Sequence, residues 1–251
     1  MALLIPLIFS GCLEINEDIS VAKNGSGKYD MKMDMGQMFE MMQSFMPAEE
    51  LEKADLDHPR DTTVLLKDYI DTASNLTAEK KALLRDGSVH LKMNMAEKIF
   101  NIDMKYPFTT LDNFQKMYAS IGESATGFGD MLKGLNGPGG TEGQAEQPNL
   151  NKIGSYFDIV SDKSSISRKL NKIKYAAMAN DSMMEQMRGM SSMGGGMLDL
   201  KLNMTVHLPS AAKKISGVKA KLSEDKKTVT LNNNMLDIFE HPENFEFSVQ
   251  F

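Results

Sequence analysis

Methionine thioethers form the most suggestive chemical clusters in this sequence. The chain has 22 methionines and no tryptophan, and the segment MKMDM places Met31, Met33 and Met35 at alternate positions. Thioethers are soft ligands that suit Cu(I). The same spacing is that of the inward face of a strand, and methionine is also common at pliable apolar binding surfaces. Three interpretations therefore stay open: core packing, a deformable apolar groove, and a Cu(I) site at Met31, Met33 and Met35.

Residues that could perform acid–base or nucleophilic catalysis form no recognisable motif. The four histidines lie far apart in the sequence, at His58, His90, His207 and His241. The chain contains neither HExxH nor GxSxG, and its glycine-rich run GLNGPGG lacks the lysine of a phosphate-binding loop. His90 and His207 fall on the polar faces of predicted strands. The sequence therefore predicts a protein that is not an enzyme and that has no cofactor.

The only cysteine, Cys12, follows an apolar run and two small residues. A single cysteine cannot form an intramolecular disulfide, so its surroundings must explain it. Residues 2–9 form an apolar run of signal-peptide type, far shorter than the roughly 20 residues that span a bilayer. Ser10 and Gly11 supply the small side chains that a signal peptidase needs before its cleavage site.

The quartet FSGC, which ends at Gly11 and Cys12, resembles the bacterial lipobox. The resemblance implies that the Cys12 thiol takes a diacylglycerol and that residues 1–11 are a signal peptide cleaved between Gly11 and Cys12. Several acyl chains, at about 0.8 kcal/mol per buried methylene, hold a protein firmly at a membrane. We therefore expect a lipoprotein of the cell envelope, anchored through its N-terminal lipid. Leu13 does not supply the aspartate that retains many lipoproteins at the inner membrane, which favours the outer membrane, at its periplasmic or surface face.

Composition agrees with a folded body beyond this anchor. A hydrophobic share of 41% with 25% charged residues is ordinary for a globular protein, and the length suits one or two domains. The net charge of -6 argues against nucleic acid as a partner.

Alternation of apolar and polar residues predicts several half-buried strands. Residues 13–21 and 29–35 flank the turn KNGSG and predict a hairpin. A second hairpin is predicted from residues 90–95 and 100–106 across AEK. Further strands are predicted at residues 198–208 and in the terminal run FEFSVQF.

Helical spacing appears between these strands. Apolar residues three and four apart predict amphipathic helices at residues 38–46, 61–72 and 111–121. Because a hairpin followed by a helix occurs twice, we expect an α+β fold. Its antiparallel sheet would be built from hairpins, with the amphipathic helices packed on one side.

A glycine-rich segment at residues 123–154 interrupts this pattern. It is poor in large apolar side chains, which predicts a linker or disordered loop. The sequence therefore divides into a signal peptide at 1–11, an N-terminal α+β part at 12–122, the glycine-rich segment at 123–154 and a C-terminal α+β part at 155–251. Whether the two parts share one sheet stays open.

Two segments carry a wider resemblance. Together with FSGC, the first hairpin ISVAKNGSGKYDMKM and the tail LPSAAKKISGVKAKLSEDKKTVTLNNNM are similar to the mycobacterial LppM-type lipoprotein domain and to uncharacterised lipoproteins of Bacteroidota. The resemblance implies a lipid-anchored α+β domain without a catalytic motif, in which a groove for lipid or glycolipid is one option. We therefore expect a non-enzymatic binding or scaffolding module at a membrane, with an apolar or lipid-like ligand favoured. A methionine-based Cu(I) protein of the envelope is the alternative.

Overall fold

The computed structural model describes residues 13–37, 40, 58–74, 76–123, 152–178, 185, 188–189 and 200–251. The predicted signal peptide with Cys12, nearly all of the predicted helix at 38–46 and most of the glycine-rich segment lie outside the described residues.

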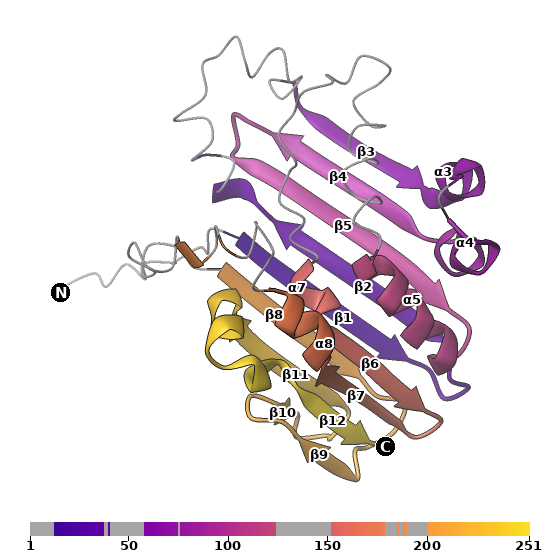
Figure 1. The fold of residues 1–251 in the computed structure, drawn as a ribbon. Coiled ribbons are helices and arrows are strands. Elements are labelled where there is room, and N and C mark those ends of the chain that lie inside the picture. Colours follow the sequence, from indigo (N-terminus) through magenta and orange to yellow (C-terminus); the bar gives the residue numbers. More distant parts are fainter. Residues whose placement is uncertain are drawn as a thin grey trace, which may run out of the picture.

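An eight-stranded sheet forms the larger part of the structure (Figure 1), in the order β10-β11-β8-β1-β2-β5-β4-β3. Its strands are β1 (Leu13–Val21), β2 (Gly27–Asp34), β3 (Arg60–Leu65), β4 (Ser88–Asn94), β5 (Ile99–Phe108), β8 (Leu200–His207), β10 (Lys221–Leu222) and β11 (Thr228–Asn234). All neighbours are antiparallel except β1 and β8, which run parallel. Strands from both sides of the glycine-rich segment thus lie in one sheet.

The hairpin of β1 and β2 confirms the first turn prediction. Asn24 accepts a hydrogen bond from the backbone N–H of Ser26 at 3.1 Å. Gly25 has a φ of 83°, in the left-handed region that glycine adopts without steric cost. The second predicted hairpin is also confirmed, since β4 pairs with β5 across the AEK segment.

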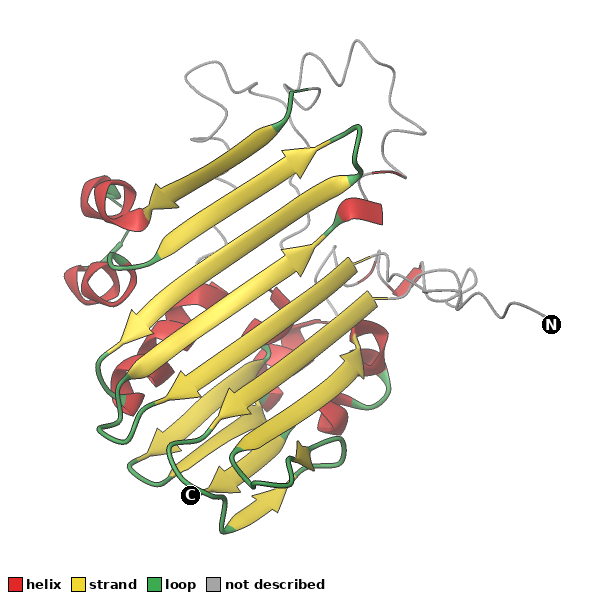
Figure 2. Cartoon of the chain, turned by 180° about the vertical axis from the view of Figure 1, so that it is seen from behind, coloured by secondary structure: helices red, strands yellow, loops and turns green. Residues whose placement is uncertain are grey.

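A second, four-stranded sheet was not predicted from the sequence, except for one strand, which lies in the predicted terminal run FEFSVQF. Its order is β6-β7-β12-β9, and its strands are β6 (Phe157–Asp162), β7 (Ser165–Leu170), β9 (Lys214–Ser216) and β12 (Phe247–Gln250). Together with helices α5 (Leu111–Glu123), α7 (Lys152–Ser155) and α8 (Lys172–Ala177), it lies on one side of the eight-stranded sheet (Figures 1 and 2). The α+β class, with helices on one side of the large sheet, is confirmed.

The helix predicted at residues 61–72 is wrong in its first half. Residues Arg60–Leu65 form β3, which pairs with β4, and only Leu66–Thr72 form a helix, α3. Thr62, Thr63 and Val64 are β-branched and favour the strand over the helix. The helix predicted at 111–121 is confirmed as α5. A further helix, α4 (Ala78–Leu84), was not predicted, because its apolar residues show no clear helical spacing.

The core lies between the covered face of the large sheet and the elements packed on it. Alternate residues of β1 and β8 are buried there, and two short 3-10 helices, η2 (Met235–Phe239) and η3 (Pro242–Phe245), add Met235, Ile238 and Phe245. In the part of the chain that the structure describes, no helix has the length and apolar character needed to span a membrane.

Candidate functional site

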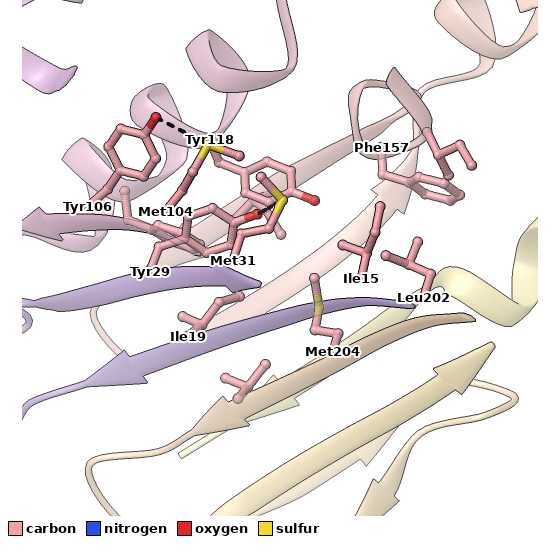
Figure 3. Packing of buried hydrophobic residues seen from close by; sticks show 14 of the residues in the cluster. Ile15, Ile19, Tyr29, Met31, Met104, Tyr106, Tyr118, Phe157, Leu202 and Met204 are labelled. Carbon is pink, nitrogen blue, oxygen red and sulfur yellow. Dashed lines mark hydrogen bonds between the residues drawn. The ribbon is translucent and has the colours of Figure 1, made fainter. Parts of the chain in front are cut away.

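A small cavity lies where the covered face of the large sheet meets α5, α7 and η2. Its volume is about 30 Å³, room for one or two water molecules. Of the described residues, Glu17, Tyr29 and Tyr118 are the polar ones that border it. The other described residues of its wall are apolar: Ile15, Met31, Ile121, Ile153, Gly154, Leu202 and Met235. Figure 3 shows Ile15, Tyr29, Met31, Tyr118 and Leu202 extending from their elements toward the same interior.

Glu17 is the one charged side chain on the inward face of β1. It occupies the inward position between Ile15 and Ile19 and is only 4% exposed. Its Oε1 accepts hydrogen bonds from Tyr29 Oη at 2.7 Å and from Tyr118 Oη at 3.1 Å. Burying a carboxylate is costly unless it is paired and hydrogen-bonded, and these contacts meet part of that requirement.

Arg168 of β7 completes the pairing. Its Nη1 donates to Glu17 Oε2 at 3.0 Å, and its side chain is 2% exposed. Its guanidinium carbon lies 4.6 Å from the centre of the Phe157 ring, a cation–π contact. Burial alone lowers the pKa of Arg168, but Tyr118, Glu17 and Tyr29 outweigh it and raise the pKa, so Arg168 keeps its charge. Among the described residues, its Nε and Nη2 donors have no hydrogen-bond partner.

The two tyrosines act as neutral donors to Glu17. Burial raises the pKa of both the Tyr29 and the Tyr118 phenol, and the negative charge of Glu17 raises each further. Their rings meet edge to face with centroids 5.6 Å apart, which fixes the two hydroxyl groups near one another. The cluster therefore joins four elements, β1, β2, α5 and β7, through one buried carboxylate.

Sequence reasoning missed this cluster, although part of its signal was present. The alternation in LEINEDISV places Glu17 on the same face as Leu13, Ile15, Ile19 and Val21, where a charge is unexpected. Arg168 could not be found in this way, because the strand SISRKL is short and was not predicted.

Met31, Met33 and Met35 share the buried face, as the alternation predicted. They are 3%, 2% and 4% exposed. Met31 lines the cavity, and Tyr29 Oη lies 3.7 Å from its sulfur (Figure 3). Such burial agrees with the core-packing interpretation. The Cu(I) site stays a prediction.

Replacing Met31, Met33 and Met35 together by leucine is expected to leave Cu(I) affinity unchanged. A swap of methionine for leucine conserves volume, so each should cost less than about 1.5 kcal/mol of unfolding free energy. A matched control is the leucine triple variant of Met93, Met104 and Met117, which are equally buried on other elements. Competition with a Cu(I) chelator measures the Cu(I) affinity of both triple variants. Loss of Cu(I) binding in the first variant alone would establish the copper site.

Two histidines lie on the uncovered face of the large sheet, as predicted. His90 Nε2 is 2.8 Å from Asp61 Oδ1, and His207 Nε2 is 2.9 Å from Asp18 Oδ2. Both histidines are partly exposed, at 34% and 47%. Within the described ranges, no three histidine, cysteine, aspartate or glutamate side chains gather as a metal site would require. Gly11 and Cys12, the predicted cleavage and lipidation residues, lie outside those ranges.

Comparison with known proteins gave one distant likeness. No protein family and no curated protein matches the chain. Among solved structures, the chain is similar to the folded domain of LppM from Mycobacterium tuberculosis, determined by NMR, with 8% identity and a TM-score of 0.38. The alignment covers 98% of this chain and 93% of that domain. A likeness this loose supports no inference about fold or function.

Proposed function

We propose that this protein is a non-enzymatic lipoprotein of the bacterial envelope whose folded body binds an apolar or lipid-like ligand. The FSGC motif supports the anchor, with the lipid carried by Cys12 and the outer membrane as its favoured location. The observation that carries the binding function is the cavity, whose surface over the described residues is almost wholly apolar. Ligand sites in proteins commonly combine a mainly apolar wall with a few placed polar groups.

The cavity is small, so a longer ligand needs its wall to move. Met31 and Met235 both contribute to that wall, and methionine changes its shape more easily than branched residues do. Ile121 and Ile153 come from α5 and from α7, the element that begins at Lys152. An apolar chain would therefore displace these side chains and occupy the space between the sheet and the two helices.

Gly154→Leu is expected to remove ligand that co-purifies with the protein. A Cβ added at Gly154 has Tyr118 Oη at 3.5 Å as its nearest neighbour, an ordinary contact, so the rest of a leucine side chain extends into the cavity. If the ligand must displace this leucine at the 1–3 kcal/mol typical of overpacking, its affinity falls by about 5- to 150-fold. Mass spectrometry of organic extracts from the purified wild type and variant measures the bound lipid.

The control is Ala177→Leu, which adds a side chain of similar size at an exposed position of α8. It should retain the ligand of the wild type. Equal amounts of bound ligand in the two variants would show that the ligand binds outside this cavity. A wild-type protein without any extractable ligand would contradict the binding function.

A further inference from the structure

Lysines gather on one narrow side of the structure, where the last strand of each sheet lies. β10 ends the large sheet, β9 ends the small one, and residues 217–220 join the two strands near the bottom of Figure 1. We call residues 213–227 the lysine-rich side. In a chain whose net charge is -6, this segment carries two carboxylates and six exposed lysines: Lys213, Lys214, Lys219, Lys221, Lys226 and Lys227.

The two carboxylates of the segment do not neutralise these lysines. Asp225 accepts hydrogen bonds from Ser223 Oγ at 2.6 Å and from the backbone N–H of Lys227 at 3.0 Å, which hold it within its own turn. Among the residues that the structure describes, no side-chain carboxylate forms an ion pair with any of the six lysines. Lysines gathered in this way give one side of an acidic protein a positive potential.

An apolar side chain projects from the lysine-rich side. Val218 is 69% exposed and lies between β9 and β10. The preceding Gly217 has a φ of 139°, and a Cβ there would stand 2.6 Å from the Glu246 carbonyl oxygen. The segment therefore packs closely against the start of β12 and holds Val218 on the outside. Lysine on an edge strand discourages pairing between sheet edges, but that role does not account for an exposed valine among the lysines.

We infer that the lysine-rich side binds the surface of an anionic lipid bilayer. Lysine ammonium groups are attracted to negatively charged headgroups, and an apolar side chain among them can enter the boundary between headgroups and acyl chains. β10 lies three strands from β1, about 14 Å across the sheet, so this side is within reach of the membrane that the predicted lipid on Cys12 would hold. The net charge of -6 opposes adsorption, so the contact is too weak to hold the chain without its anchor and instead orients the anchored body.

Val218→Trp provides the measurement, because the chain has no tryptophan of its own. In the full-length Cys12→Ser protein, which cannot be lipidated, the indole fluorescence should shift to the blue with vesicles of phosphatidylcholine and phosphatidylglycerol in equal parts. Vesicles of phosphatidylcholine alone should give no shift, and high salt should remove it. Leu65→Trp is the matched control, because Leu65 is 67% exposed at the opposite edge of the large sheet and should give no shift.

Two triple variants of the Val218→Trp protein test the charge. The first replaces three lysines of the lysine-rich side by glutamine: Lys214, Lys219 and Lys221. Each lysine near an anionic surface contributes about fivefold in affinity, so this variant should bind the anionic vesicles about 100-fold more weakly. The second replaces three exposed lysines on the uncovered face of the large sheet and should change the affinity far less: Lys32, Lys92 and Lys105.

The outcomes are distinct. An equal blue shift in Leu65→Trp would overturn the inference, as would a shift in Val218→Trp that is as large with phosphatidylcholine alone. A first triple variant that binds the anionic vesicles as tightly as the second would overturn it as well. None of these results bears on the cavity, whose ligand is tested separately by Gly154→Leu.

Discussion

Replacing Cys12 with serine is expected to move the protein from the membrane fraction to the soluble fraction and to abolish its labelling by radioactive palmitate. Cys12 is the only cysteine, so the variant has no thiol that could accept diacylglycerol. A net charge of -6 also disfavours adsorption to anionic lipid. Cell fractionation and palmitate labelling of the wild type and the variant measure both effects.

Ser10→Ala is the control for this prediction, since alanine keeps a small residue before the cleavage site. It should be labelled and fractionate like the wild type. A Cys12→Ser variant that stays at the membrane at its unprocessed mass would show that residues 2–9 act as an uncleaved anchor. A wild-type protein that takes up no palmitate would contradict the lipoprotein assignment itself.

Glu17→Met is expected to lower the free energy of unfolding by about 3–5 kcal/mol, because it leaves Arg168 buried and unpaired. It also leaves the hydroxyl groups of Tyr29 and Tyr118 without their acceptor. Arg168→Met should lower the free energy of unfolding by less, because Glu17 would keep the hydrogen bonds from both tyrosines. Urea titration monitored by circular dichroism gives the free energy of each variant.

The double variant Glu17→Met/Arg168→Met should be more stable than Glu17→Met alone. Removing both charges leaves no buried charge unpaired, and methionine fills much of the space of either side chain. The non-additivity of this double-mutant cycle measures the coupling within the pair. Glu14→Met, on the other face of β1, is the matched control and should change stability by about 0.5 kcal/mol or less. A Glu17→Met variant as stable as this control would contradict the burial of the pair.

Local patterns were enough to predict much of the fold. Alternation predicted β1, β2, β4, β5 and β8, and three-four spacing predicted α5, because in each case one face is buried and the other is not. The error at β3 has the same origin. Val64 and Leu65 fit a helical period, but their strand is held by pairing with β4, a contact that no local pattern contains.

The candidate site depends on contacts that are distant in sequence, which explains why less of it was predicted. Arg168 and Glu17 are 151 residues apart, and their pairing requires the second sheet to lie over the first. The parallel register of β1 with β8 is equally non-local, joining Leu13 to Leu200. Period-two alternation places a side chain on a face but does not select the neighbouring strand.

If Cys12 carries a lipid as predicted, the position of β1 determines how far the cavity stands from the bilayer. β1 begins at Leu13, so the predicted lipidated residue Cys12 is followed at once by the strand, with no spacer between them. Ile15, which lines the cavity, is three residues beyond Cys12, about 10 Å along an extended strand. With the proposed lipid on Cys12, the body would stay at the headgroups, and the proposed ligand would exchange with the membrane without crossing bulk water.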